Sequence, residues 1–222
     1  MNVQSMLEQY LAEEIIDLPQ GISAAGIVVE NRSASIIAYV GNARFDLGAG
    51  AEWVDCANSP RSPGSTLKPF VYLAAMEAGT IIPATLLADT PLRLGGEAPR
   101  NFDRMYRGPV TAHTALAASL NTPAVRVMRS VGVRKALDFL RAAGFSCLNR
   151  EDADYGDSLV LGAGEVTLLE LARAYSTLAR QGLDRPLLLR RAPAGMSDKD
   201  SGVGANSEKS SATDGRRKAV PL

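Results

Sequence analysis

The feature of the sequence that most constrains its fold is a segment of helical length with almost no polar face. From residue 67 to residue 76 nearly every side chain is apolar, so a helix formed here must be buried on most sides. Proline is tolerated in a helix only in the first turn, and Pro69 therefore places the helix start close to Ser65. Gly79 suits the position just beyond the helix end. We predict a core helix that carries Ser65 and Lys68 at its amino end.

Ser65 and Lys68 form a Ser-x-x-Lys pair that could carry chemistry. Residues three apart at a helix start share a face and lie within reach of each other. A serine becomes a nucleophile when a base removes its proton, and burial can lower the pKa of a lysine until it serves as that base. With 17 serines and five lysines, the pair is expected by chance about 0.4 times. It can equally be a capping serine followed by a solvated lysine, although an unpaired charge on so apolar a helix is costly.

The first third of the chain predicts a small β element next to a helix. Two short runs at 24–29 and 35–40 are apolar and partly β-branched, which is typical of a two-stranded hairpin. The Gly-rich stretch 41–63 predicts a loop, in which we expect Trp53 to pack on the core. Residues 6–16 predict an amphipathic helix. The buried face expected for this helix consists of Met6, Tyr10, Leu11 and Ile15.

The middle of the chain predicts a cluster of helices. Four prolines and three glycines mark 80–110 as an irregular connection. We expect Thr122 to cap a helix that starts at Pro123, while Thr167 and Glu170 fit a capping box. The predicted helices are 111–119, 123–130, 133–143 and 168–181, the last with Leu168, Leu171, Ala172, Tyr175 and Leu178 inward. With the hairpin, these helices give an α+β chain.

Charge and composition exclude several classes of function. The 24 basic and 24 acidic residues cancel, so the sequence lacks the positive excess typical of nucleic-acid binders, and we expect no nucleic-acid partner. One histidine and two distant cysteines, Cys56 and Cys147, supply no metal-ligand cluster, so we expect no metal and no cofactor. The cysteines are interpreted as ordinary thiols, with a disulfide left open. Neither an 18-residue apolar span nor a basic leader is present, so no membrane helix or signal peptide is predicted.

Ser119 and Asn121 form a second candidate site, where the predicted helix 111–119 ends. A hydroxyl can relay a proton, and an amide can hold a lysine or a peptide carbonyl. The same residues are also common in caps and turns, which is the alternative interpretation. His113 lies nearby, and a single histidine on a short helix is expected to be structural.

Three blocks of the sequence carry a family resemblance. They read Ser-Pro-Gly-Ser-Thr-Leu-Lys-Pro-Phe at 62–70, Ala-Ser-Leu-Asn-Thr-Pro-Ala-Val at 118–125, and Leu-Gly-Ala-Gly-Glu-Val-Thr-Leu-Leu-Glu-Leu-Ala at 161–172. In this order they resemble the transpeptidase domain of class A penicillin-binding proteins, and within that class the 1C branch. The resemblance implies a serine β-lactamase/transpeptidase-like α+β fold, with a helical cluster beside an incomplete antiparallel sheet.

The resemblance also implies acyl transfer in peptidoglycan cross-linking. Ser65 would attack the D-Ala-D-Ala bond of a stem peptide, and Lys68 would accept its proton, although the base in this enzyme group is disputed. Ser119 would pass a proton to the leaving amine, and Asn121 would position Lys68 and the substrate amide. β-Lactams would acylate the same serine. The family works on the periplasmic face of the inner membrane.

One motif of that family is missing from the sequence. None of the five lysines is followed by Thr-Gly or Ser-Gly, whereas the family binds the substrate carboxylate with Lys-Thr/Ser-Gly on a strand. We expect an N-terminal helix and lead-in at 1–20, a partial transpeptidase domain at 21–192 and a disordered polar tail at 193–222. The chain thus resembles a larger enzyme truncated at both ends, with any membrane contact made by absent upstream parts.

Three functions stay open on this evidence. The first is a penicillin-binding transpeptidase impaired by the missing motif, the second is a non-catalytic remnant or interaction module, and the third is a β-lactamase-type hydrolase. The block at 161–172 resembles the synthase branch of the family, which disfavours the hydrolase.

Overall fold

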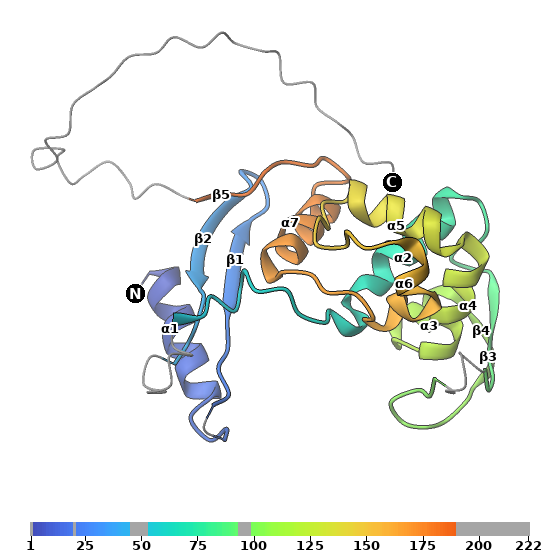
Figure 1. Ribbon diagram of the computed structural model, residues 1–222, viewed down its shortest axis with the longest axis horizontal. Coiled ribbons are helices and arrows are strands. Elements are labelled where there is room, and N and C mark those ends of the chain that lie inside the picture. Colours follow the sequence, from blue (N-terminus) through green and yellow to red (C-terminus); the bar gives the residue numbers. More distant parts are fainter. Residues whose placement is uncertain (1, 20, 45–52, 93–98, 190–222) are drawn as a thin grey trace, which may run out of the picture.

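The computed structural model describes residues 2–19, 21–44, 53–92 and 99–189, and it places a small sheet beside a cluster of helices (Figure 1). In chain order the elements are α1 (Val3–Glu14), β1 (Gly26–Glu30), β2 (Ser35–Val40), the 3₁₀ helix η2 (Gly64–Leu67), α2 (Lys68–Glu77), β3 (Leu86–Asp89), β4 (Gly108–Thr111), α3 (Ala112–Ala117), α4 (Asn121–Val131), α5 (Val133–Ala142), α6 (Asp152–Tyr155), the 3₁₀ helix η3 (Asp157–Leu161), α7 (Leu168–Ala179) and β5 (Leu188–Leu189). The fold is α+β, as predicted. The predicted polar tail lies outside the described residues.

The predicted hairpin is confirmed as β1 and β2, which pair antiparallel with an irregularity between Val28 and Val29. Every second residue of β2 is buried, as the two-residue repeat of a strand requires. β5 adds a short parallel contact on the outer edge of β2. The other side of the hairpin lies next to α7, which stands between the sheet and the remaining helices (Figure 1).

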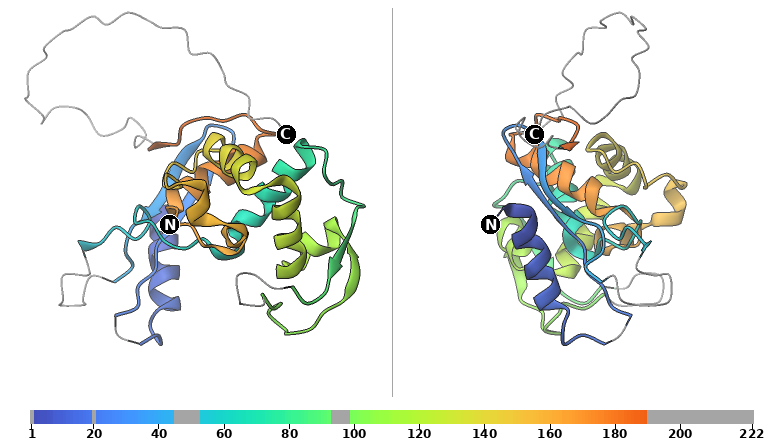
Figure 2. Two further views of the ribbon diagram at one scale, coloured as in Figure 1. Left: turned by 45° about the vertical axis from the view of Figure 1, so that its right-hand side comes forward. Right: turned by 90° about the vertical axis from the view of Figure 1, so that its left-hand side faces the viewer.

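Helix α1 packs on the hairpin, and its predicted buried face was right for Leu11 and Ile15 but not for the other two residues (Figure 2). A Cβ added to Gly26 would lie 3.0 Å from Cδ1 of both Leu7 and Leu11, so these two leucines rest directly on the strand. Met6 and Tyr10 are more than half exposed, and their predicted burial was wrong. The helix has few apolar residues, so its sequence pattern could not show whether Leu7 or the pair Met6 and Tyr10 would face the hairpin.

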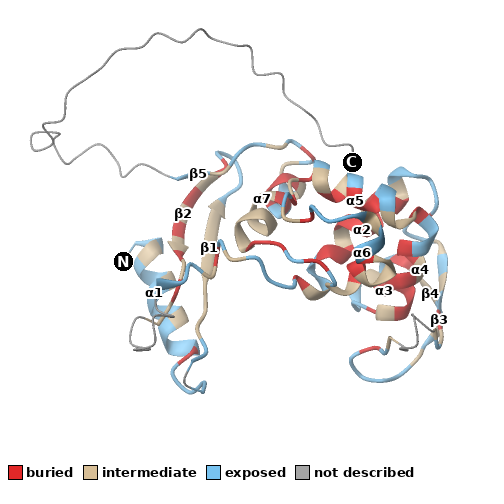
Figure 3. Cartoon of the chain, in the orientation of Figure 1, coloured by how far each residue is buried: buried red, intermediate tan, exposed pale blue. Residues whose placement is uncertain are grey.

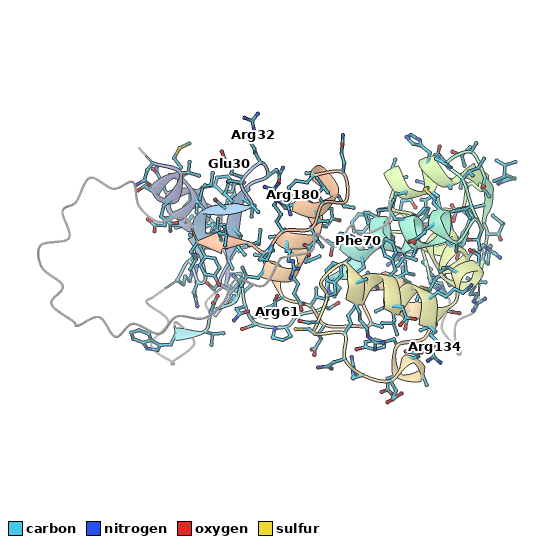
Figure 4. All side chains as sticks on the ribbon, turned by 90° about the horizontal axis from the view of Figure 1, so that it is seen from above. Glu30, Arg32, Arg61, Phe70, Arg134 and Arg180 are labelled. Carbon is cyan, nitrogen blue, oxygen red and sulfur yellow. The ribbon has the colours of Figure 1, made fainter. Side chains whose placement is uncertain are left out.

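The hydrophobic core lies in the helical cluster and is centred on α2 (Figure 3). This helix packs against α3, α4, α5 and η3, so it is covered on several sides, as its apolar sequence predicted. Phe70 lies on the side of α2 that faces α7 (Figure 4). Its ring makes edge-to-face contacts with Phe145 at 5.1 Å and Tyr175 at 5.2 Å between ring centroids. Aromatic contacts therefore connect α2 to α7 and to the segment that follows α5.

Several helix limits follow the local sequence signals. Pro69 lies in the first turn of α2, and Gly79 follows the helix with a φ of +70°. Gly144, with a φ of +104°, follows α5 in the same way. Thr167 and Glu170 form the predicted capping box at the start of α7.

The region predicted to be irregular, 80–110, contains a two-stranded sheet. β3 and β4 pair antiparallel from Leu86 opposite Thr111 to Asp89 opposite Gly108. The strands are four residues long, and β4 contains Pro109, which a sequence pattern counts against a strand. Proline is tolerated here because each strand of a two-stranded sheet has a free edge.

Three smaller expectations were wrong. Trp53 is 81% exposed and does not pack on the core. Helix α4 begins two residues earlier than predicted, and Thr122 lies inside it with its hydroxyl donating to Asp89 Oδ1 at 2.5 Å instead of capping the helix. In α7 the buried residues are Ala174, Ser176 and Thr177. Leu171 and Leu178 pack on the core as predicted, whereas Tyr175 is 41% exposed and only its ring contact with Phe70 faces the interior.

Candidate active site

Ser65 lies in the 3₁₀ turn η2, directly before α2. Gly64 has a φ of +54°, and the turn is closed by Thr66, whose N–H and Oγ1 both donate to the Pro63 carbonyl at 3.1 and 2.7 Å. Tyr175 Oη donates to the Thr66 carbonyl at 2.8 Å, so α7 also supports the turn. Ser65 is exposed at the surface of this turn.

The segment that precedes Ser65 is bound to the third sequence block. Arg61 exchanges two backbone hydrogen bonds of 2.9 Å with Val166, and Ser62 Oγ donates to the Gly162 carbonyl at 2.8 Å. A Cβ added to Gly162 would lie 2.6 Å from the backbone of Gly64, so the two chain segments touch where only a glycine fits. The third block therefore supports the turn that presents Ser65.

Lys68 is the first residue of α2, and only 1% of it is exposed. Its Nζ donates to the Ser119 carbonyl at 2.6 Å, to Ser119 Oγ at 3.2 Å and to Asn121 Oδ1 at 2.7 Å. These three oxygens are neutral, and among the described residues no carboxylate lies within ion-pair distance of Nζ. Burial disfavours the ammonium and lowers the pKa of Lys68 to about 8. The amine is thus partly available as a base near neutral pH.

Ser119 and Asn121 occupy the short link between α3 and α4. Ser119 follows α3 with a φ of +51°, a backbone conformation that residues other than glycine rarely adopt. Leu120 is buried and fixes the link to the core, while Asn121 is the first residue of α4. Strained residues of this kind cluster at functional sites, where surrounding contacts hold them in place.

Ser65, Ser119 and Asn121 line one open depression of about 670 Å³. The structure therefore brings Lys68 into direct contact with Ser119 and Asn121, and it places Ser65 beside the same two residues. Lys68 Nζ donates its hydrogen bonds to Ser119 and Asn121 and not to Ser65 Oγ. His113 is exposed on α3 and does not line the depression.

The sequence did not reveal several residues of the depression. Its wall includes Arg100, Asn101, Phe102 and Arg107, all from the stretch predicted to be irregular. Asn101 Oδ1 accepts the backbone N–H of Asn121 at 2.8 Å, although the two residues are 20 positions apart. No local pattern marks such a contact, since it depends on how a loop returns to a helix start.

The arrangement has the parts required for nucleophilic catalysis. An exposed hydroxyl lies at the start of a helix, and a buried amine with a lowered pKa lies nearby on the same helix. A second hydroxyl contacts that amine directly and can carry a proton between it and a bound molecule. None of the helices in the described part of the chain is long and apolar enough to cross a lipid bilayer.

Comparison with known proteins gives matches that cover this site. Residues 24–213 match the family model described as the penicillin binding protein transpeptidase domain. Penicillin-binding protein 1C of Escherichia coli is 40% identical over 165 residues, which make up 74% of this chain and 21% of that protein. Penicillin-binding protein 1B of Vibrio cholerae is 35% identical over 194 residues, which cover 83% of this chain and 24% of that protein. The chain thus spans between a fifth and a quarter of the length of these relatives.

A solved structure has the same architecture. The PonA1 protein of Mycobacterium tuberculosis in complex with penicillin V superposes with a TM-score of 0.69 and 25% identity. The superposition covers 82% of this chain and 50% of that one. The α+β transpeptidase fold predicted from the sequence is confirmed.

Proposed function

The chain belongs to the penicillin-binding protein transpeptidase family, and we propose that its site performs the acylation half of D,D-transpeptidation with Ser65 as the nucleophile. The observation that carries this proposal is the buried Lys68 amine, which is in contact with Ser119 and Asn121 behind the depression that Ser65 lines. The substrate is a stem peptide of peptidoglycan that ends in D-Ala-D-Ala, met on the periplasmic side of the membrane.

In the first step Ser65 Oγ bonds to the carbonyl carbon of the penultimate D-Ala. The hydroxyl proton passes to Lys68 Nζ, which accepts it because burial keeps part of the amine neutral. The C–N bond to the terminal D-Ala then breaks. The leaving amine takes a proton that Ser119 Oγ relays from Lys68, which the 3.2 Å contact between them permits.

Asn121 has a positioning task in this scheme. Its Oδ1 holds Lys68 at 2.7 Å, and its Nδ2 donates to the Arg100 carbonyl at 2.7 Å, which fixes the orientation of the amide. Since the amide faces the depression, it can also contact the peptide carbonyl of a bound substrate. Because the Asn121 amide is fixed, it keeps the base Lys68 at a constant distance from the nucleophile Ser65 during the reaction.

The 222 residues contain neither Lys-Thr-Gly nor Lys-Ser-Gly, and we propose that this slows the reaction. In the family that motif binds the substrate carboxylate, and its strand supplies one N–H to the oxyanion. Loss of one oxyanion donor costs about 3 kcal/mol of transition-state stabilisation, or about two orders of magnitude in rate. We expect slow acylation of Ser65 and little cross-linking by this chain.

A labelled penicillin tests the nucleophile, because a β-lactam resembles D-Ala-D-Ala and should acylate the same hydroxyl. The purified chain is incubated with the label, and the modified peptide is identified by mass spectrometry. We expect a stable adduct on Ser65, lost in Ser65→Ala and retained in the control Ser59→Ala, whose hydroxyl donates to the Asp55 carbonyl at 2.7 Å. Labelling that persists in Ser65→Ala would refute the assignment.

The same experiment separates the other two functions. A folded chain that forms no adduct at any penicillin concentration would be a non-catalytic remnant or an interaction module. Rapid release of hydrolysed penicillin with no lasting adduct would identify a β-lactamase-type hydrolase.

A further inference from the structure

We infer that Asp89 is a positioning residue for the Ser65 site and that it acts through Asn101 and Asn121 on Lys68. This inference rests on the proposed function only for its consequence on acylation. The chain of contacts that supports it is independent of which reaction the site performs.

Asp89 ends β3 and is fully buried, so its carboxylate must be satisfied inside the protein. Both of its oxygens accept from Asn101 Nδ2 at 2.9 Å. Thr122 Oγ1 donates to Oδ1 at 2.5 Å, and the Arg107 N–H donates to Oδ2 at 3.0 Å. The Arg107 guanidinium is 3.9 Å from Oδ2 and supplies the nearest opposite charge.

The carboxylate dictates the orientation of the Asn101 amide. An ionised carboxylate only accepts hydrogen bonds, so the NH₂ end of Asn101 must point toward Asp89. The second hydrogen of this NH₂ group is taken by the Met105 carbonyl, to which Nδ2 donates at 2.8 Å. Oδ1 of Asn101 is then turned toward α4, where it accepts the backbone N–H of Asn121 at 2.8 Å. If the amide were reversed, its Oδ1 would face the Asp89 carboxylate, which also only accepts. Its Nδ2 would then face the backbone N–H of Asn121, which also only donates.

The contact at Asn121 matters because this residue opens α4. The first N–H groups of a helix have no partner within the helix, and here Asn101 Oδ1 supplies one from another segment. With its N–H fixed by Asn101 and its Nδ2 fixed by the Arg100 carbonyl, Asn121 can direct Oδ1 only toward Lys68. A buried carboxylate thereby orients the group that holds the amine.

A purely structural role is the competing explanation, since removal of any buried hydrogen-bonded group lowers stability. Thr177 provides a matched control on α7. It is 4% exposed, and its Oγ1 donates to the Arg173 carbonyl at 3.0 Å. Thr177→Val should lower the melting temperature without any effect on the site. Asp89→Asn and Asn101→Ala should lower it and also alter the environment of Lys68.

The decisive readout is the titration of Lys68 by Cε–Nζ correlation NMR on the full 222-residue chain labelled in its five lysines, with the Lys68 signal assigned from Lys68→Arg. In Asp89→Asn and Asn101→Ala we expect the Lys68 pKa to fall by at least half a unit, because the ammonium loses a fixed acceptor. Above pH 9, where the amine is largely neutral in every variant, we also expect the penicillin acylation rate to fall about tenfold, because the amine is no longer held in its productive position. Thr177→Val should change neither quantity.

A Lys68 titration that stays unchanged in Asp89→Asn and Asn101→Ala would overturn the inference, whatever the melting temperatures of these variants. Should Asp89→Asn fail to fold, Asn101→Ala and Asn101→Gln test the same link from the other side. If the parent chain forms no penicillin adduct, the proposed function fails, while the Lys68 titration still decides whether Asp89 orients the amine.

Discussion

Lys68 Nζ lies 2.7 Å from Asn121 Oδ1, so the first residue of α2 donates a hydrogen bond to the first residue of α4. Both helix starts carry positive partial charge, which disfavours a cation placed between them. Burial acts in the same direction and lowers the pKa of Lys68 to about 8. The core therefore holds an amine that gives up its proton more readily than a surface lysine.

The rate of Ser65 acylation should follow the protonation of this amine. With a pKa of about 8, roughly one Lys68 in ten is neutral at pH 7, and only the neutral form can accept the Ser65 proton. We expect the rate of penicillin acylation to rise about tenfold per pH unit below pH 8 and to level off above it. Stopped-flow measurement with a chromogenic β-lactam between pH 5.5 and 9.5 checks the profile.

Lys68→Arg is the control for this profile. Arginine retains the positive charge but cannot be deprotonated in this pH range, so acylation should fall to background at every pH. A profile that stays flat across pH 8 in the parent chain would remove Lys68 from the role of base.

The same burial should make the stability of the protein depend on pH. The pKa of Lys68 is about 8 in the folded state and 10.5 as a free side chain, so between these values the unfolded chain binds more protons. The free energy of unfolding must then rise with pH in that window, by at most about 1.4 kcal/mol per unit. Measured relative to Lys68→Met, the parent chain should gain stability from pH 8 to pH 10. A constant difference would contradict the lowered pKa.

The pattern-based predictions succeeded where one local signal decided the structure. Pro69 and Gly79 bracket the core helix, and Thr167 with Glu170 caps α7, because each acts through the backbone within a few residues. The neighbours of Lys68 could not be found this way. They are more than 50 residues away along the chain, at Ser119 and Asn121. The motifs suggested these residues, while their contact required the packing of α2 against α4.

The support behind the site was not visible in the sequence. Asp89 and Asn101 lie in a stretch rich in proline and glycine, where composition predicts only irregular structure. The described part of this stretch instead contains β3 and β4, and it places a buried carboxylate beside the start of α4. Short strands that pair only with each other have too little periodicity to be recognised.

Ser119 combines a backbone strain with a side-chain role, and two substitutions separate them. Its φ of +51° costs a residue with a Cβ about 1 kcal/mol relative to glycine. Ser119→Gly should therefore be more stable than Ser119→Ala by about 1 kcal/mol in chemical denaturation. Both variants lack the hydroxyl that contacts Lys68 Nζ, so both should be acylated more slowly by a similar factor. Restored acylation in Ser119→Gly would assign the effect to strain and not to the hydroxyl.

The close approach of Gly162 to Gly64 makes a final prediction about the turn that carries Ser65. A Cβ at residue 162 would lie 2.6 Å from the Gly64 backbone, and the φ of +102° is also unfavourable for any side chain. Gly162→Ala must therefore push η2 away from its place, which should lower stability by more than 2 kcal/mol and slow Ser65 acylation at least tenfold.

Gly156→Ala isolates the steric part of this effect. Gly156 also has a positive φ, +57°, but a Cβ there would meet nothing within 4 Å. It should cost only the backbone strain, about 1–3 kcal/mol because its ψ of −165° lies outside the left-handed helical region, and leave acylation unchanged. Thermal unfolding and penicillin labelling of the two variants in parallel make the comparison. Equal acylation in both would mean that the position of Ser65 does not depend on the third sequence block.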